Sequence, residues 1–400
     1  ARNTIKMVAV HSCADTGEAT KDLIEGLVKR TGAACTSPAF IYVFYGCDHD
    51  SSVIQSTVAD TWPGIPFLGG TSCGGVMVDG TVWDAKSIGV LTIEDADGDY
   101  GVGMAKIDES AADAADRALN EALLAAGCPG EVPEMVWIFQ APGAEEEVIS
   151  GLRRSVGDSC PIVGGSAADN TVEGNWMQIG PQGVQADSVV IGVLFTSGGI
   201  GFSFQSGYET SGPQGIATRC DGRTIHEIDG VPAAQIYNDW TGGQIADKLD
   251  GGGAILADTT MCPISVGAGE TNGIPRYRLI HPEAITADGG LSTFATVEEG
   301  ARIHAMRGDR EQLIGRAGKV AREAAEALPR GIDSLAGGLM VYCAGCCMAV
   351  GEEMDRVALT VADSFSHAPY LGCFTFGEQG PLVDRNVHGN LMISAIAFGS

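Results

Sequence analysis

Along the chain, a continuous run of apolar residues is followed by apolar residues spaced three to four positions apart, and this sequence of two patterns occurs three times. Nearly uninterrupted apolar runs at 40–45, 135–139 and 339–343 predict buried strands. Each run is followed by apolar residues at three-to-four spacing, which line one face of a helix. A strand and a longer amphipathic helix precede each run, and an apolar strand closes each unit. The pattern predicts an α/β fold with three pseudo-repeats of strand, helix, strand, helix, strand, loop and strand.

A glycine-rich loop recurs at the same place in each predicted unit. In all three copies a proline and two apolar residues precede a glycine and a run of small residues, at 65–75, 160–170 and 368–378. We therefore interpret the chain as an internal triplication. Because equivalent loops of such a fold gather at one place, the loop residues that differ between copies are the candidates for function.

One long segment interrupts the triplication. Its residues 220–233 alternate across two glycine turns and predict a β-hairpin, and a helix near 234–240 and strands at 276–280 and 291–297 follow. We interpret the segment as an inserted α+β subdomain beside the third unit, whose first strand we place at 301–306. The predicted order is repeat 1 at 1–96, repeat 2 at 97–196, the inserted subdomain at 197–300 and repeat 3 at 301–400.

Composition narrows the class of protein. With 44% hydrophobic and 19% charged residues, the 400-residue chain is typical of a folded protein with a large core. Its net charge of −27 makes it an acidic protein and argues against nucleic acid or an anionic membrane as partner, since both require a basic surface. No run of about 18 apolar residues predicts a membrane span. We read no export signal at its start and expect a cytoplasmic protein, and its apolar edge strands are compatible with a homodimer.

Twelve cysteines in a chain expected to be cytoplasmic predict reduced thiols rather than a disulfide framework. Several follow predicted strands, where open α/β sheets bind ligands. The pair Cys343 and Cys346 is compatible with a redox dithiol, with structural thiols or with groups that line a ligand. One such pair cannot complete a four-ligand zinc site, and we predict no metal site. Cys47, Asp48 and His49 are metal-capable residue types and remain an alternative metal or haem contact.

Four stretches together resemble FIST-domain proteins. They are 164–170, 221–223 with 228–233, 299–302 and 372–378, and the last of them, extended by 386–390, is the most specific. The resemblance covers nearly the whole chain, with a FIST N-terminal region to about residue 200 and a FIST C-terminal region over the remainder. It implies a sensory domain that binds a small ligand in signal transduction. Amino acids have been proposed as ligands of the family, and some members bind haem and respond to nitric oxide.

The chain departs from this family in one position. An arginine commonly follows the equivalent of the segment 343–345, and here Cys346 stands in its place. A simple anionic ligand would lose its natural charge partner there.

The main functional hypothesis is a sensor without chemistry of its own, which acts through a separate signalling partner. Its pocket would form from the glycine-rich loops, where backbone amides can approach a ligand closely. The predicted ligand-binding residues are Gly70, Ser72, Cys73, Gly165, Ser166, Asp169, Asn170, Cys343, Cys346, Cys373, Gly377 and Glu378.

Two alternatives stay open, and with them the question of whether the chain is an enzyme. The first is a cysteine-dependent hydrolase of a small cyclic amide, with Cys343 as nucleophile and Asp169 and Glu378 as acid/base groups. Triplicated α/β folds with a central site also occur among ring-opening amidohydrolases, which is an analogy of fold alone. The second is a haem-based nitric-oxide sensor. Its candidate axial ligands are His49, His367, His388 and Cys343.

Overall fold

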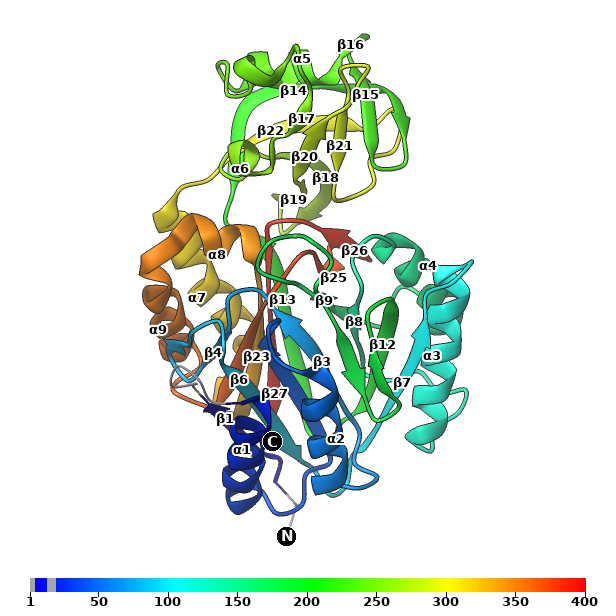
Figure 1. The fold of residues 1–400 in the computed structure, drawn as a ribbon, viewed down its shortest axis with the longest axis vertical. Coiled ribbons are helices and arrows are strands. Elements are labelled where there is room, and N and C mark those ends of the chain that lie inside the picture. The colour runs from blue at the N-terminus through cyan, green and yellow to red at the C-terminus, as the bar shows by residue number, and fades with distance from the viewer. Residues whose placement is uncertain (1–3, 13–18) are drawn as a thin grey trace.

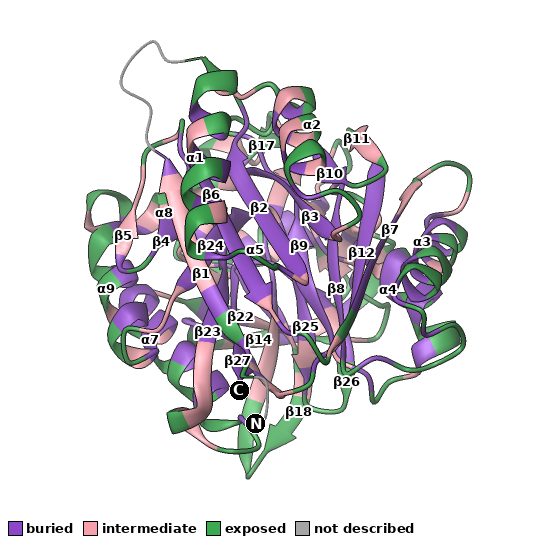
Figure 2. Cartoon of the chain, turned by 90° about the horizontal axis from the view of Figure 1, so that it is seen from below, coloured by how far each residue is buried: buried purple, intermediate pink, exposed green. Residues whose placement is uncertain are grey.

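The computed structural model of the protein describes residues 4–12 and 19–400, and it shows a mixed α/β body that carries a smaller, strand-rich subdomain (Figure 1). Three six-stranded sheets form the body. Their inner faces meet in one apolar core, and helices cover their outer faces. Figure 2 shows this layering as buried strands surrounded by helices whose outer sides are exposed.

The first sheet joins strands from two distant parts of the chain. Its central strands β2 and β3 are parallel, and its other neighbours are antiparallel. In spatial order the strands are β1 (Lys6–Ser12), β6 (Ile88–Glu94), β2 (Phe40–Gly46), β3 (Phe67–Ser72), β10 (Gln178–Gly180) and β11 (Gly183–Gln185). Helices α1 (Thr20–Ala34) and α2 (Ser51–Thr61) bury their apolar faces against this sheet.

The second sheet has the same arrangement around the parallel pair β8 and β9. In spatial order its strands are β26 (Arg385–Gly389), β25 (Glu378–Leu382), β9 (Ile162–Ser166), β8 (Met135–Gln140), β12 (Ser188–Phe195) and β7 (Asp99–Lys106). Helices α3 (Ala111–Ala125) and α4 (Glu145–Val156) cover its outer face.

The third sheet is built around the parallel pair β23 and β24. In spatial order its strands are β13 (Gly199–Ser206), β27 (Met392–Gly399), β23 (Leu335–Cys343), β24 (Tyr370–Thr375), β4 (Val76–Val78) and β5 (Thr81–Val82). Helices α7 (Arg310–Glu326) and α9 (Met354–Ser364) cover it, and the short helix α8 (Ala344–Val350) follows β23 directly.

Each sheet is completed by a hairpin from another part of the chain. The hairpin β4–β5 leaves the first sheet and pairs with β24 of the third, β10–β11 leaves the second and pairs with β3, and β25–β26 leaves the third and pairs with β9. This cyclic exchange ties the three sheets together. It puts the residues that follow β3, β9 and β24 at one place.

The core between the sheets consists of large apolar side chains on alternate strand positions. Phe40, Tyr42 and Phe44 of β2 meet Trp137 and Phe139 of β8 there. The intervening residues of each strand face the helices, as the period of two along a strand requires. Side-chain caps help to fix where helices begin: Asp309 accepts from the backbone amide of Gln312 at 2.8 Å, and the Gln312 side chain completes a capping box.

The subdomain contains a nine-stranded antiparallel sheet with its own apolar core. Its strands are β14 (Glu209–Asp221), β15 (Thr224–Ile228), β16 (Val231–Pro232), β17 (Gly253–Ala254), β18 (Ile264–Thr271), β19 (Ile274–Ile280), β20 (Pro282–Ile285), β21 (Leu291–Thr293) and β22 (Arg302–Arg307). The subdomain also contains helices α5 (Ala233–Trp240) and α6 (Leu256–Thr259). The predicted hairpin at 220–233 forms through β14 and β15.

One predicted strand forms but has the wrong partner. The segment at 301–306 was expected to open the third unit, whereas its residues 302–306 belong to β22, which pairs with β14 and β18 of the subdomain. The place beside β27 belongs to β13, which precedes the subdomain in the chain. The reason is that a periodic pattern identifies a strand without identifying the strand next to it.

Candidate functional site

The three glycine-rich loops meet at the end of the body that faces the subdomain (Figure 1). Backbone hydrogen bonds join each loop to the next and close a ring. The Cys73 amide donates to the Phe374 carbonyl at 3.0 Å, the Ser166 amide to the Gly377 carbonyl at 2.9 Å, and the Ala168 amide to the Thr71 carbonyl at 3.1 Å. We call this set, together with the 343–347 segment, the loop ring.

Cys343 stands at the last position of β23, directly before α8, and its side chain is buried. Burial opposes ionisation of its thiol. Hydrogen bonds from the Cys346 side chain and from the backbone amides of Cys346, Gly345 and Leu391 nevertheless hold the pKa of Cys343 below its ordinary value. The surroundings of Cys343 therefore favour a thiolate.

Glu378 lies beside Cys343 and is fully buried. Its carboxyl accepts from Thr375 Oγ1 at 2.7 Å and from the Met392 amide at 2.9 Å. Burial, followed by the charge of Cys343, raises the pKa of Glu378 well above its ordinary value. The two neighbouring groups therefore shift in opposite directions, because the pKa of Cys343 is lowered and that of Glu378 is raised.

The other thiols near the ring differ from Cys343. Burial raises the pKa of Cys73 to about 12 and that of Cys347 to about 12. Burial also raises the pKa of Cys346 and Cys373. All eleven cysteines of the described part of the chain are free thiols. Cys343 is therefore the thiol of the loop ring whose surroundings lower its pKa rather than raise it.

Three polar residues of the predicted site are occupied in shaping the loops. The Asp169 carboxylate accepts four backbone N–H groups between residues 171 and 175, at 2.5–3.1 Å. Asn170 Oδ1 accepts from the Gly74 amide at 2.8 Å, and Ser72 Oγ donates to the Gly75 carbonyl at 2.6 Å. Because these side-chain oxygens already form hydrogen bonds within the loops, they are less available to bind a ligand or a proton.

The glycines of the predicted site have a packing role. A Cβ at Gly70, whose φ is +148°, would collide with the Met177 carbonyl that precedes β10 and would lie 2.6 Å from a Phe139 ring carbon. A Cβ at Gly165 would lie 2.5 Å from Thr375 Cγ2, and one at Gly377 would lie 2.5 Å from the imidazole of His388. Because glycine has no Cβ, the exchanged hairpins and the neighbouring loop can approach the backbone closely at these positions.

The subdomain contributes residues that the sequence did not reveal. Tyr208 Oη lies 3.9 Å from Cys346 Sγ and donates to the Thr260 carbonyl at 2.7 Å. His281 is buried behind α8, and burial lowers its pKa to about 4. Its backbone amide donates to Asn390 Oδ1 at 3.0 Å. The 386–390 segment, which carries the family resemblance, therefore joins the body to the subdomain.

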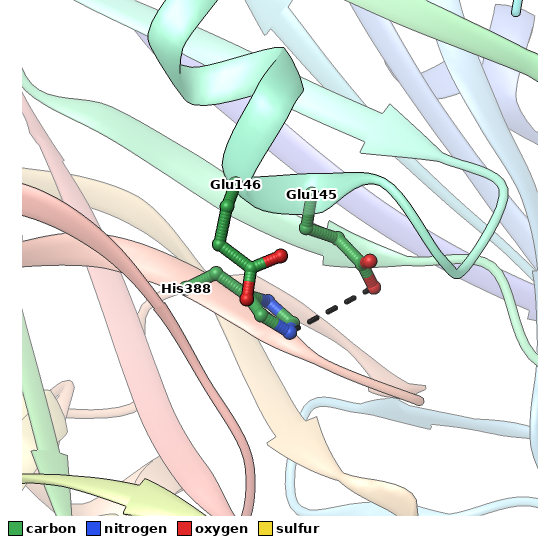
Figure 3. Close-up of side chains that lie close together, drawn as sticks. All are labelled: Glu145, Glu146 and His388. Atoms are coloured by element: carbon green, nitrogen blue, oxygen red, sulfur yellow. Dashed lines mark ion pairs between the residues drawn. The ribbon is translucent and has the colours of Figure 1, made fainter. Parts of the chain in front are cut away.

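A buried polar cluster links Ser166 of the loop ring to the subdomain. Figure 3 shows three of its members, Glu145, Glu146 and His388. Ser166 Oγ donates to Glu145 Oε2 at 2.7 Å, and Arg223 of the subdomain pairs with Glu145 at 2.9 Å and with Glu146 at 2.5 Å. His388 Nε2 lies 3.9 Å from Glu145 and 2.9 Å from the Phe294 carbonyl. Glu145 and Arg223 are not among the residues predicted from the sequence, since charged residues at a helix start and in a hairpin turn are common on surfaces.

Within residues 4–12 and 19–400, Glu145, Glu146 and His388 are the one group of three whose ligand atoms lie close enough to hold a metal ion. Burial raises the pKa of Glu145, but nearby His388 and Arg223 outweigh it, so the net shift is downwards. Arg223 already supplies the positive charge that a metal would bring. The cluster is therefore best described as an ion-pair network.

The histidines named as haem ligands are separated in the structure. Both ring nitrogens of His388 are hydrogen-bonded, Nδ1 to the Gln379 side chain and Nε2 to the Phe294 carbonyl. His49 contacts Thr20 and the Lys86 carbonyl in the same way, and the side chain of His367 is 76% exposed. Cys343 is the candidate among the four that lies in the loop ring.

The family follows from comparison with known proteins. Residues 39–231 match the FIST N domain, and residues 233–381 match the FIST C domain. The chain belongs to the FIST family. FIST domains are associated with signal transduction and small-ligand sensing. No helix of the described part of this FIST protein is long and apolar enough to cross a membrane.

Individual relatives add little to this assignment. The FIST protein is 32% identical over 94 residues to the uncharacterised protein MJ1623 of Methanocaldococcus jannaschii, a match that covers 24% of this chain and 18% of that protein. The chain thus spans less than a fifth of that relative. A crystal structure of a cyanuric acid hydrolase from A. caulinodans superposes with a TM-score of 0.33 and 10% identity over 99% of this chain and 100% of that one. At that TM-score the likeness carries no argument about activity.

Proposed function

We propose that this FIST protein is a sensor that binds a small molecule at the loop ring, with Cys343 and Glu378 as its central contacts. The observation that carries the proposal is that the side chains of Cys343 and Glu378 are buried together at the place where three loops and the subdomain converge. A charge held in low dielectric by preorganised amides interacts strongly with a ligand dipole.

The same pair limits the chemistry of the ligand. The Cys343 thiolate accepts hydrogen bonds, and the neutral Glu378 carboxyl both donates and accepts them. A small neutral or cationic molecule with an N–H donor beside a carbonyl fits this combination. A simple carboxylate would meet the thiolate charge, and Cys346 supplies no counter-charge for it.

Transmission to a partner would run through the subdomain. The loop ring is connected to the subdomain by Ser166, Glu145 and Arg223, and also by the contact between Cys346 and Tyr208. A ligand that shifts Ser166 or Cys346 changes bonds that hold the subdomain in place. A separate signalling protein would read the altered position of the subdomain.

A cysteine-dependent hydrolase of a small cyclic amide is a second candidate, favoured by the same Cys343–Glu378 pair. The thiolate would attack the amide carbonyl carbon, and the C–N bond would break as Glu378 transfers its proton to the leaving nitrogen. Water would then hydrolyse the thioester and return a proton to Glu378. Asp169 is not needed for this scheme, because its oxygens organise the loop.

Native mass spectrometry with an absorbance scan tests the proposal. The protein is purified without added ligand, as wild type, Cys343→Ser and Cys220→Ser, the last as a control distant from the loop ring. A bound small molecule in wild type and Cys220→Ser that is lost in Cys343→Ser supports the sensor. A Soret band with the same dependence assigns haem to Cys343.

Turnover is followed with a panel of cyclic amides. Ring opening by wild type but not by Cys343→Ser would make the protein a hydrolase. Retention of the same molecule by all three proteins would exclude the loop ring as the binding site.

A further inference from the structure

A cavity of about 450 Å³ lies where the subdomain meets the body, apart from the loop ring. Helix α4 and strand β26 form its walls on the body, and β18, β19 and the 296–301 segment form its walls on the subdomain. A cavity of this size holds a small organic molecule. Its ionisable lining residues are Glu146, Arg153, Arg278, Glu298, Arg385 and His388.

Arg278 on β19 is the lining residue whose charge has the least compensation. Its guanidinium donates to two neutral carbonyls, of Thr296 at 2.9 Å and of His388 at 3.4 Å. Among the side chains that the structure describes, no carboxylate forms an ion pair with Arg278 within 4.0 Å. A cation that has lost much of its water and has no anion beside it is unfavourable, and a bound anion removes that cost.

Neither acidic residue on the cavity wall forms an ion pair with Arg278. Glu146 is already paired with Arg223 at 2.5 Å and accepts from the Thr296 amide at 2.6 Å. Glu298 is exposed and acts on Arg278 only from a distance. Donors of the planar guanidinium therefore remain for a ligand, and their fork geometry matches a carboxylate or a phosphate.

The opposite wall offers a second cation. Arg153 of α4 lies on the body side, where its Nε pairs with Asp158 at 2.5 Å and its Nη2 donates weakly to the Asn386 carbonyl at 3.4 Å. An anion in the cavity would have Arg278 of the subdomain on one side and Arg153 of the body on the other.

We propose that this cavity binds a small carboxylate or phosphate anion through Arg278 and thereby holds the subdomain against the body. The proposal is independent of any ligand at the loop ring. It also differs from it in chemistry, since the loop ring presents a buried thiol and carboxyl and this cavity presents the guanidinium of Arg278.

Calorimetric titration of the full chain with sodium succinate and with sodium phosphate, at an ionic strength kept constant with NaCl, tests the proposal. We expect saturable binding of at least one anion at a single site. Binding of succinate alone assigns an organic carboxylate, and binding of phosphate alone assigns a phosphate-bearing ligand. No saturable binding of either anion would overturn the proposal.

Three variants locate the site. Arg278→Met should weaken binding roughly tenfold or more, because it removes a charge-assisted hydrogen bond. Arg307→Met, on the same subdomain but in an exposed pair with Glu209, should leave it unchanged. Glu298→Gln, an exposed change that keeps the fold, should tighten binding several-fold by removing a like charge. Equal affinity in wild type and Arg278→Met, or weaker binding in Glu298→Gln, would contradict the assignment.

Discussion

Arg223 of the subdomain and Glu145 of the body form an ion pair at 2.9 Å, with side-chain exposures of 23% and 2%. Glu145 sits at the first residue of α4 and also accepts from Ser166 of the loop ring. One guanidinium therefore joins the subdomain, a helix start and the loop ring. In the proposed sensor, this pair would make the position of the subdomain depend on the loop ring.

Removing Arg223 should destabilise the protein strongly. Arg223→Gln leaves Glu145 buried without its cation, and the loss of one partner of a buried ion pair costs about 3–5 kcal/mol. Urea denaturation of the variant at neutral pH measures the free energy of unfolding. Arg356→Gln, which removes exposed pairs with Glu311 and Glu353, should change the free energy of unfolding far less, because water screens these charges. Equal losses in the two variants would show that Arg223 is not an anchor of the subdomain.

The Glu146 carboxylate should make stability depend on pH. Burial opposes its ionisation, but the charges of His388 and Arg223 outweigh burial and lower its pKa to about 2, from an ordinary value of 4.5. The folded protein then binds fewer protons than the unfolded chain below pH 4.5. The stabilisation is present above that pH and is lost as the pH falls towards 2.

Comparison with Glu146→Gln isolates this contribution. The free energy of unfolding of the wild type should exceed that of the variant by about 2–3 kcal/mol at pH 7, and the difference should shrink steadily between pH 5 and pH 3. Urea denaturation at each pH provides the measurement. A difference that does not vary with pH would show that the carboxylate acts through packing.

Cys343 should react with alkylating agents at a lower pH than its neighbours. The Cys346 thiol donates to Cys343 and favours its thiolate, so Cys346→Ala should raise the pH at which Cys343 alkylation reaches half its maximal rate. Peptide mapping by mass spectrometry after brief exposure to iodoacetamide follows each thiol separately. Cys347→Ala is the matched control, and the Cys343 profile should stay unchanged in it. Alkylation of Cys73 before Cys343 at pH 7 would refute the thiolate assignment.

Much of the fold was predictable from local pattern, and the site only in part. Apolar runs identified strands such as β2 and β8, and the repeated loops were expected to gather, as the Ser166–Gly377 contact confirms. The exchange of hairpins was not predictable, because strand spacing does not encode a partner in another sheet. Glu145 and Arg223 were not predicted, because they form an ion pair with each other across 78 positions of the sequence and no local pattern indicates that contact.

The glycine loops provide a further test of the fold. Gly70→Ala places a methyl group against the Met177 carbonyl and the Phe139 ring, at a φ of +148° that alanine rarely adopts. Overpacking and backbone strain together should cost about 2–4 kcal/mol. Gly32→Ala in α1 meets no atom within 4 Å and should stabilise the protein by about 0.5–1 kcal/mol. Thermal and urea denaturation of both variants distinguish the two effects. A Gly70→Ala variant as stable as the wild type would show that the close approach of β10 does not require glycine at this position.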